Sequence, residues 1–151
     1  MKILLAIDDS KFSEAATQVA LRELRPDRTE VCVLNVVEPI LAPPYEYIGD
    51  VETLNAEQQK TLKHGKEMVG RTQQLLERAG FKVHPVVEEG DPKSTIIDYA
   101  SHWKADLIIV GSHGRRGLDR FLMGSVAEAV ARHAPCSVLI SRRSFGAAAE
   151  H

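Results

Sequence analysis

The stretch from residue 105 to 126 constrains the fold most, because it combines a strand, a glycine-bearing loop and the start of a helix. Residues 107–110 (LIIV) form an unbroken apolar run, which suits a parallel strand covered on both faces. In residues 111–116 (GSHGRR), glycines let the backbone turn sharply and present its N–H groups, and two arginines favour an anion. The expected helix start offers further N–H donors, so this stretch predicts an anion-binding loop.

The helix that follows this loop is expected to begin at Ser125. Ser125 and Glu128 have the spacing of a capping box, in which the serine is the N-cap. Glu128 would also compete with a phosphate for the N–H groups of the first turn, which counts mildly against a highly charged ligand.

Strand-like and helix-like segments alternate along the whole chain. The alternation favours a parallel sheet with right-handed crossovers, and 151 residues suit a single domain. The expected strands are 2–7, 30–37, 82–87, 107–110 and 137–141, and the expected helices are 13–24, 54–79, one from Pro92 and one from Ser125.

Three glycines and a serine carry a resemblance to a known family. Gly111, Gly114, Gly124 and Ser125 give the pattern G-x2-G-x9-G-[ST] directly after a strand, which resembles the nucleotide-binding signature of the universal stress protein family. The opening MKILLAIDDS, the turn EEGDP at 88–92 and the closing HAPCSVLIS resemble other parts of the same family. The resemblance therefore covers nearly the whole chain.

The resemblance implies a Rossmann-like α/β fold over residues 1–143, with residues 144–151 expected to be a disordered tail. The expected fold is a single doubly wound, five-stranded parallel sheet of strand order 3-2-1-4-5 with helices on both faces. In that order the first and fourth strands are neighbours at the point where the order reverses, and ligands bind beyond their carboxyl ends. Asp8 and Gly111 should then line the same crevice, although about a hundred residues separate them.

An adenine-nucleotide site is expected in this crevice. Main-chain N–H groups of the glycine loop and the Ser125 hydroxyl would hold phosphates and ribose, with charge-assisted bonds from Arg115 or Arg116. Asp8 would bind a ribose hydroxyl or orient a metal-bound phosphate, and the resemblance implies that the main chain near Val36 meets the adenine. The expected nucleotide-binding residues are Ala6, Ile7, Asp8, Val36, Val110, Gly111, His113, Gly114, Arg115, Arg116, Gly124, Ser125 and Val126. The alternative is that the glycines only turn the chain and Ser125 is only an N-cap.

Neighbouring segments receive structural interpretations. Asp9 is assigned to the start of the first helix, as a charge favourable to its dipole, and Ser10 or Ser13 is expected to be the N-cap of that helix. The polar run 56–67 is assigned to the solvated face of the second helix, in which Gly65 and Gly70 allow a close approach to the sheet. The irregular segment 38–53 is interpreted as a lid or binding loop, or as a loop packed on its own tyrosines.

Composition excludes several classes of function. A formal net charge of −2, from 19 basic and 21 acidic side chains, argues against a nucleic-acid binder. No apolar run approaches the roughly 20 residues of a membrane span, so a cytoplasmic protein is expected. Cys32 and Cys136 are expected to be buried free thiols. The histidines show no ligand spacing, so no dedicated metal site is expected, although Mg²⁺ could accompany ATP.

The sequence therefore predicts a stress-response protein that binds ATP, or AMP or ADP, and acts as a ligand-dependent switch or interaction module for an unknown protein partner. A P-loop and a G-x-S-x-G elbow are both missing, so no catalytic residue is assigned and ATP hydrolysis should be slow at most. The family's dimerisation through its last strand implies a homodimer through 137–141; the alternative is that the tail from Arg142 to His151 covers this edge. Two alternatives remain: an interaction protein of this fold without nucleotide, and a slow hydrolase or nucleotidyl-transfer enzyme.

Overall fold

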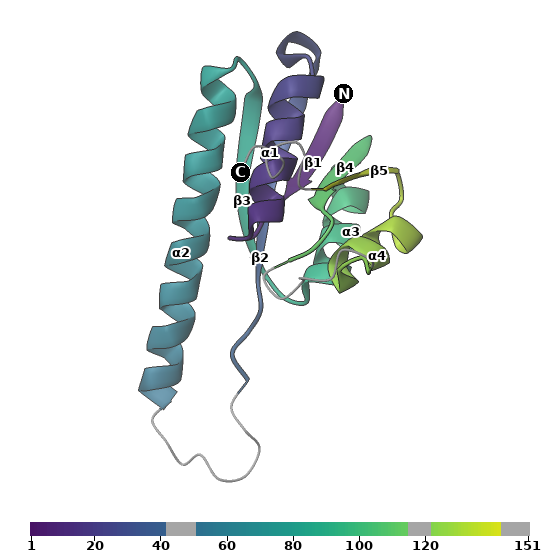
Figure 1. The fold of residues 1–151 in the computed structure, drawn as a ribbon. Helices are drawn as coiled ribbons and strands as arrows, with labels where there is room; N and C mark the ends of the chain where they lie inside the picture. The colour runs from purple at the N-terminus through teal and green to yellow at the C-terminus, as the bar shows by residue number, and fades with distance from the viewer. Residues whose placement is uncertain (42–50, 115–121, 143–151) are drawn as a thin grey trace, which may run out of the picture.

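The computed structural model describes residues 1–41, 51–114 and 122–142, and its centre is a five-stranded parallel sheet (Figure 1). The strands lie in the order β3-β2-β1-β4-β5, which confirms the predicted order. The strands are β1 (Lys2–Ala6), β2 (Glu30–Val37), β3 (Lys82–Glu89), β4 (Leu107–Gly111) and β5 (Ser137–Ser141). The helices are α1 (Lys11–Glu23), α2 (Val51–Arg78), α3 (Pro92–Trp103) and α4 (Ser125–His133), with a short 3₁₀ turn at Pro26–Arg28.

Helices cover both faces of the sheet, as a doubly wound fold requires (Figure 1). Alternate residues of each strand point to opposite faces, so β1 contributes Leu5 to one apolar cluster and Leu4 to the other. α1 and α2 pack on the Leu5 face, whereas α3 and α4 pack on the Leu4 face. The central strands β2, β1 and β4 are therefore buried on both sides, which is why their sequences are mostly apolar.

Side-chain caps start two of the helices as expected. The Ser10 Oγ accepts a hydrogen bond from the Ser13 N–H (3.3 Å) at the start of α1, and an Asp91 carboxylate oxygen accepts one from the Ser94 N–H (3.1 Å) at α3. Each cap satisfies an N–H that has no partner within its helix. The helices therefore begin close to the ends of the strands that precede them.

The predicted capping box at α4 is wrong. The N-cap is Gly124, whose N–H donates to the Ser112 carbonyl (2.8 Å) and whose carbonyl accepts from the Glu128 N–H (2.9 Å). Ser125 is instead the first helical residue, and Glu128 pairs with Arg132 at 3.0 Å. The cause is tertiary, since the bond from Gly124 to the end of β4 fixes where the helix begins.

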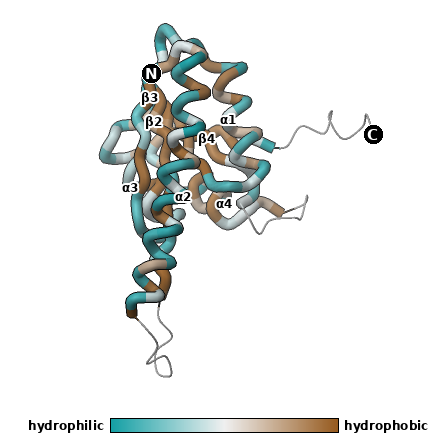
Figure 2. The backbone as a smooth tube through the Cα atoms, turned by 90° about the vertical axis from the view of Figure 1, so that its left-hand side faces the viewer, coloured by the Kyte–Doolittle hydropathy of each residue, from teal (hydrophilic) through white to brown (hydrophobic). Residues whose placement is uncertain are grey.

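α2 is longer than predicted, and its first turns extend beyond the carboxyl ends of the strands (Figures 1 and 2). The close approach expected at Gly65 is confirmed, because a Cβ there would lie 2.6 Å from Asn35 Oδ1. The same expectation for Gly70 is wrong, since no atom lies within 4 Å of a Cβ at that position. The buried residues of α2 all lie between Gly65 and Leu76, so only the second half of the helix packs on the sheet, and Gly70 faces away from it.

β3 and β5 are the two edge strands. β5 coincides with the predicted range and pairs with β4 alone, while dimerisation through it stays a prediction. No helix among residues 1–41, 51–114 and 122–142 is long and apolar enough to cross a membrane. The domain limits at 143 and 144, and the expected tail, are not tested by the described residues.

Both cysteines are free, as predicted, although only Cys32 is fully buried. Burial raises the pKa of the Cys32 thiol to about 11 against a smaller opposing effect of a hydrogen bond with Tyr99, so the thiol is protonated at neutral pH. Cys136 is half-buried just before β5. Its pKa is raised mainly by this partial burial and, to a smaller extent, by the charge of Asp106.

Candidate functional site

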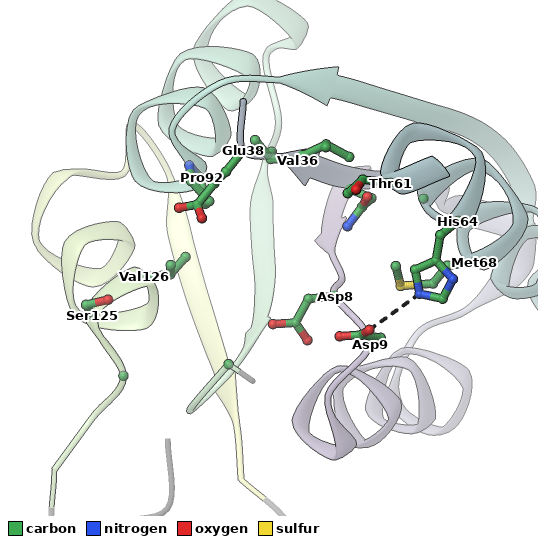
Figure 3. Close-up of a pocket in the computed structure, with 15 residues that line it drawn as sticks. Asp8, Asp9, Val36, Glu38, Thr61, His64, Met68, Pro92, Ser125 and Val126 are labelled. Atoms are coloured by element: carbon green, nitrogen blue, oxygen red, sulfur yellow. Dashed lines mark ion pairs between the residues drawn. The ribbon is translucent and has the colours of Figure 1, made fainter. Parts of the chain in front are cut away.

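A cavity of about 760 Å³ lies beyond the carboxyl ends of β1 and β2, beside the loop that follows β4 (Figure 3). This is the place predicted by the reversal of strand order between β1 and β4. Its lining comprises Asp8, Asp9, Asn35, Val36, Val37, Glu38, Thr61, His64, Gly65, Met68, Pro92, Gly114, Gly124, Ser125 and Val126.

Asp8 projects from the end of β1 toward the cavity, with one carboxylate oxygen fixed (Figure 3). Its Oδ1 accepts hydrogen bonds from the Ser10 N–H (2.9 Å) and the Ser13 hydroxyl (2.8 Å), and its own N–H donates to Ser13 Oγ (2.7 Å). The other oxygen, Oδ2, would lie 3.1 Å from a Cβ on Gly114. Asp8 and the glycine loop therefore share the cavity, and Oδ2 is directed toward the space between them.

The three signature glycines have different structural roles. A Cβ on Gly111 would lie 2.7 Å from the Cβ of Phe12, and one on Gly124 would lie 2.9 Å from the Cα of His113. Packing alone therefore requires glycine at 111 and 124. Gly114 is different, because its absent side chain leaves room beside Asp8 Oδ2 inside the cavity. None of the three has a positive φ.

His113 ties the end of β4 to the segment before α4. Its Nε2 contacts the Leu122 carbonyl, so this nitrogen carries the proton, and Nδ1 accepts a hydrogen bond from the Ser112 hydroxyl (3.0 Å). The ring also contacts that of Phe12, with centroids 4.9 Å apart. His113 is absent from the cavity lining. Arg115 and Arg116 lie outside the described residues.

Val36 presents its main chain to the cavity where β1 has already ended. The Leu34 carbonyl accepts from the Ile7 N–H (2.9 Å) on one side of β2, and the Val37 carbonyl accepts from the Gly90 N–H (3.0 Å) on the other. Because hydrogen bonding alternates between the two sides of a strand, the N–H and carbonyl of Val36 face the β1 side. β1 ends at Ala6, opposite Leu34, so nothing of β1 covers them.

The other predicted residues near these strand ends lie beneath the cavity lining and are not part of it. Ala6, Ile7 and Val110 are buried, and Gly111 packs on Phe12. The Ile7 carbonyl accepts from Asn35 Nδ2 (2.9 Å), which fixes the side chain of Asn35 in the cavity floor. Ile7 contributes to an adjoining groove of about 440 Å³ between α1 and α2 rather than to the cavity itself.

The start of α4 forms the wall opposite α2 (Figure 3). Ser125 and Val126 are its first two residues, and first-turn N–H groups have no partner within a helix. Because Gly124 is the N-cap, the Ser125 hydroxyl is not used to cap the helix. The glycine loop, Ser125 and Val126 therefore bring main-chain donors and a hydroxyl to one side of the cavity.

Sequence reasoning missed the wall that α2 supplies. The cavity side of α2 carries Thr61, His64 and Gly65, from the polar run assigned to the solvated face, and Met68 just after that run. Asp9, assigned only to the helix start, also lines the cavity, where its Oδ2 lies 3.4 Å from His64 Nε2. A glycine inside a polar helical run, opposite a polar residue inside a buried strand, is the signal that could have indicated this wall.

The site contains carboxylates, one histidine and main-chain donors, and this arrangement is suited to binding a polar ligand. Among the described residues, no three His, Cys, Asp or Glu side chains are grouped so that they could hold a metal ion.

Comparison with known proteins gives consistent matches over nearly the whole chain. The profile of the Universal stress protein family matches residues 1–142. Universal stress protein MJ0531 of Methanocaldococcus jannaschii is 36% identical over 144 residues, covering 94% of this chain and 82% of that protein. A putative universal stress protein of Staphylococcus aureus is 33% identical over 142 residues, covering 93% and 82%.

Solved structures agree with these matches. Hypothetical protein MJ0577 superposes with a TM-score of 0.82 at 30% identity, covering 95% of this chain and 96% of that one. Universal stress protein UspA from Lactobacillus plantarum superposes with a TM-score of 0.78 at 27% identity, covering 94% and 97%.

Proposed function

Because the chain belongs to the universal stress protein family, we propose that it binds an adenine nucleotide in the cavity and acts as a ligand-dependent switch or interaction module. ATP is the ligand that we favour, with AMP and ADP as variants of the same chemistry. Mg²⁺ would arrive with the phosphates.

One observation carries this proposal, namely the convergence of three kinds of contact on one cavity. The unpaired main-chain edge of Val36 suits the donor and acceptor pattern of a purine base. Asp8 Oδ2 suits a ribose hydroxyl, and the first N–H groups of α4 suit a phosphate. The three kinds of contact correspond to the base, the sugar and the phosphate of a nucleotide.

Solved relatives lend support at the level of the fold. An Arabidopsis thaliana member of the family has AMP bound, at 20% identity and a TM-score of 0.68. Another universal stress protein is in complex with cAMP, at 21% identity and a TM-score of 0.63. At these identities only the fold carries over, so the proposal for this chain depends on its own residues.

The proposed output is a change of binding state, and the proposed setting is the cytoplasm. Among the described residues β5 pairs with β4 alone, and an apolar edge strand favours association, so a homodimer through residues 137–141 is part of the proposal. Partner choice would then depend on the nucleotide held by each copy.

The test starts with freshly purified protein, which is denatured so that any released nucleotide can be identified. Protein freed of ligand is then titrated with ATP and Mg²⁺ by calorimetry. We expect micromolar or tighter binding, and at least tenfold weaker binding in Gly114→Val, because the added side chain would occupy the space beside Asp8 Oδ2.

Gly70→Ala is the matched control, since its added Cβ meets no atom within 4 Å and lies outside the cavity lining. It should bind ATP as the unaltered chain does. The absence of both co-purified nucleotide and binding heat up to millimolar ATP would contradict the proposal and favour an interaction protein of the same fold.

A further inference from the structure

Asp8 and Ser13 are joined by two hydrogen bonds where the chain passes from β1 into α1. The Ser13 hydroxyl donates to Asp8 Oδ1 (2.8 Å), and the oxygen of the same hydroxyl accepts from the Asp8 N–H (2.7 Å). Because both bonds end on one serine, they fix the carboxylate of Asp8 relative to its own main chain. The carboxylate that points into the cavity is therefore held in a defined orientation (Figure 3).

The first turn of α1 holds Ser13 in place. Its N–H donates to the Oγ of the N-cap Ser10 (3.3 Å), and its carbonyl accepts from the Thr17 hydroxyl (3.0 Å). Only 7% of Ser13 is exposed, so water hardly competes for its hydroxyl. Ser13 is therefore a fixed support for Asp8.

Ser13 lies behind Asp8 as seen from the cavity. It lines the adjoining groove between α1 and α2, and it is absent from the described lining of the cavity itself. Asp8 lines both spaces. An effect of Ser13 on a ligand in the cavity would therefore have to pass through Asp8.

The two carboxylate oxygens of Asp8 have different surroundings. Oδ1 accepts from the Ser10 N–H (2.9 Å) and from the Ser13 hydroxyl, and both donors belong to the start of α1. In the part of the chain that the structure describes, no donor bonds Oδ2, which faces the space beside Gly114. A carboxylate oxygen accepts hydrogen bonds, so a ligand group in this space should be a donor. A sugar hydroxyl meets this requirement, whereas an ionised phosphate oxygen does not.

We propose that Ser13 is a positioning residue through which the cavity selects ribonucleotides over deoxyribonucleotides. Its hydroxyl holds Oδ1 of Asp8, so Oδ2 stays in the orientation that accepts a hydrogen bond from a ribose hydroxyl. Without the Ser13 hydroxyl the carboxylate can rotate about its side-chain bonds, and the contact with the sugar weakens. The inference rests on the proposed nucleotide site and names the kind of sugar that this site recognises.

The experiment measures the dissociation constants of ATP, 2′-deoxy-ATP and 3′-deoxy-ATP by calorimetry with Mg²⁺, in the unaltered chain and in Ser13→Ala. All three ligands carry the same base and triphosphate, so the ratio of their affinities isolates the contact with the sugar. A hydrogen bond to a carboxylate corresponds to roughly tenfold in affinity, so the unaltered chain should bind at least one deoxy analogue about tenfold more weakly than ATP. In Ser13→Ala we expect most of this preference to be lost.

Ser94→Ala is the matched control. At the start of α3 the Ser94 hydroxyl and N–H both donate to Asp91 Oδ2 (3.1 Å each), and neither residue belongs to the described cavity lining. The control thus loses the same kind of serine–aspartate bond at a helix start. Its preference for ATP over the deoxy analogues should equal that of the unaltered chain.

Two further variants test whether Ser13 acts through Asp8. Asp8→Ala lacks the acceptor, so adding Ser13→Ala to it should leave the ratio of affinities unchanged. Ser13→Thr keeps a hydroxyl at this position and should keep the preference of the unaltered chain.

Equal affinities of the unaltered chain for ATP and both deoxy analogues would overturn the inference while leaving the nucleotide site intact. An undiminished preference in Ser13→Ala, with its fold checked by circular dichroism, would also overturn it. Absence of ATP binding by the unaltered chain would overturn the proposed function, and the inference with it.

Discussion

At the scale of single residues, Gly65 determines how closely α2 approaches the sheet. A Cβ at this position would lie 2.6 Å from Asn35 Oδ1 and 3.4 Å from a methyl group of Val37. Asn35 cannot move easily, because it is buried and its Nδ2 donates to the Ile7 carbonyl. The missing side chain therefore permits the α2 wall of the cavity to exist where it does.

We expect Gly65→Ala to destabilise the protein by about 1–3 kcal/mol, because the added methyl group must displace α2 or Asn35. Gly70→Ala, in the same helix, should instead stabilise it by about 0.5–1 kcal/mol, because alanine favours the helix and meets no neighbour. Urea denaturation of the two variants measures both values. Equal effects of the two substitutions would contradict the packing at Gly65.

Individual residues also show why part of the site could not be predicted from the sequence. Asp8 was predicted to share a crevice with Gly111, because the strand order places their strands side by side. Asp8 does line the cavity, but the glycine beside it is Gly114, whereas Gly111 packs on Phe12. His64 was missed, because a polar helical face looks the same whether it meets solvent or a polar cavity. Which of the two it meets depends on where a segment distant in the sequence lies.

At the scale of elements, strands were predicted better than helix ends. β1, β2, β4 and β5 agree with their predicted ranges to within one residue, because burial on both faces demands an apolar run and a turn signal ends it. α4 begins at Ser125 as predicted, but its N-cap was misassigned, since the cap is Gly124, whose N–H is held by the carbonyl of Ser112. Rules for helix caps that use only the local sequence fail where a hydrogen bond to a distant segment fixes the N-cap instead.

The outer edge of β5 gives a prediction at this scale. The Ser141 carbonyl accepts from the Ser112 N–H on the β4 side, so alternation directs the N–H of Val138 to the open edge. Val138→Pro removes this donor while sparing the bonds to β4, because proline is tolerated where its nitrogen faces away from the sheet. We expect the unaltered chain to be a dimer and Val138→Pro a folded monomer.

Light scattering at micromolar concentration measures the two masses, and circular dichroism checks the fold of the variant. A monomeric unaltered chain, or a variant that still dimerises, would contradict pairing through this edge. An exposed-helix change such as His102→Gln serves as the control and should leave the mass unaltered.

At the scale of the whole molecule, the cavity collects residues from segments that are distant in the chain. Its lining comes from the ends of β1 and β2, from α2, and from the starts of α3 and α4. A ligand held there contacts both layers of helices and the sheet between them. Binding should therefore stabilise the domain as one unit.

We expect saturating ATP and Mg²⁺ to raise the Tm in scanning calorimetry. At a concentration of 100 times the Kd, mass action contributes about 2.7 kcal/mol to the free energy of unfolding, which corresponds to roughly 5–10 °C for a domain of this size. Gly114→Val should show little shift at the same ATP concentration. An equal shift in that variant would place the ligand elsewhere.

The length of α2 has a mechanical consequence. One continuous helix of 28 residues carries His64 in the cavity wall and Val51 beyond the sheet, about 20 Å away at 1.5 Å per residue. An α-helix resists bending over such a distance, so a tilt of α2 about the close contact at Gly65 would displace its first turn further than the cavity wall itself.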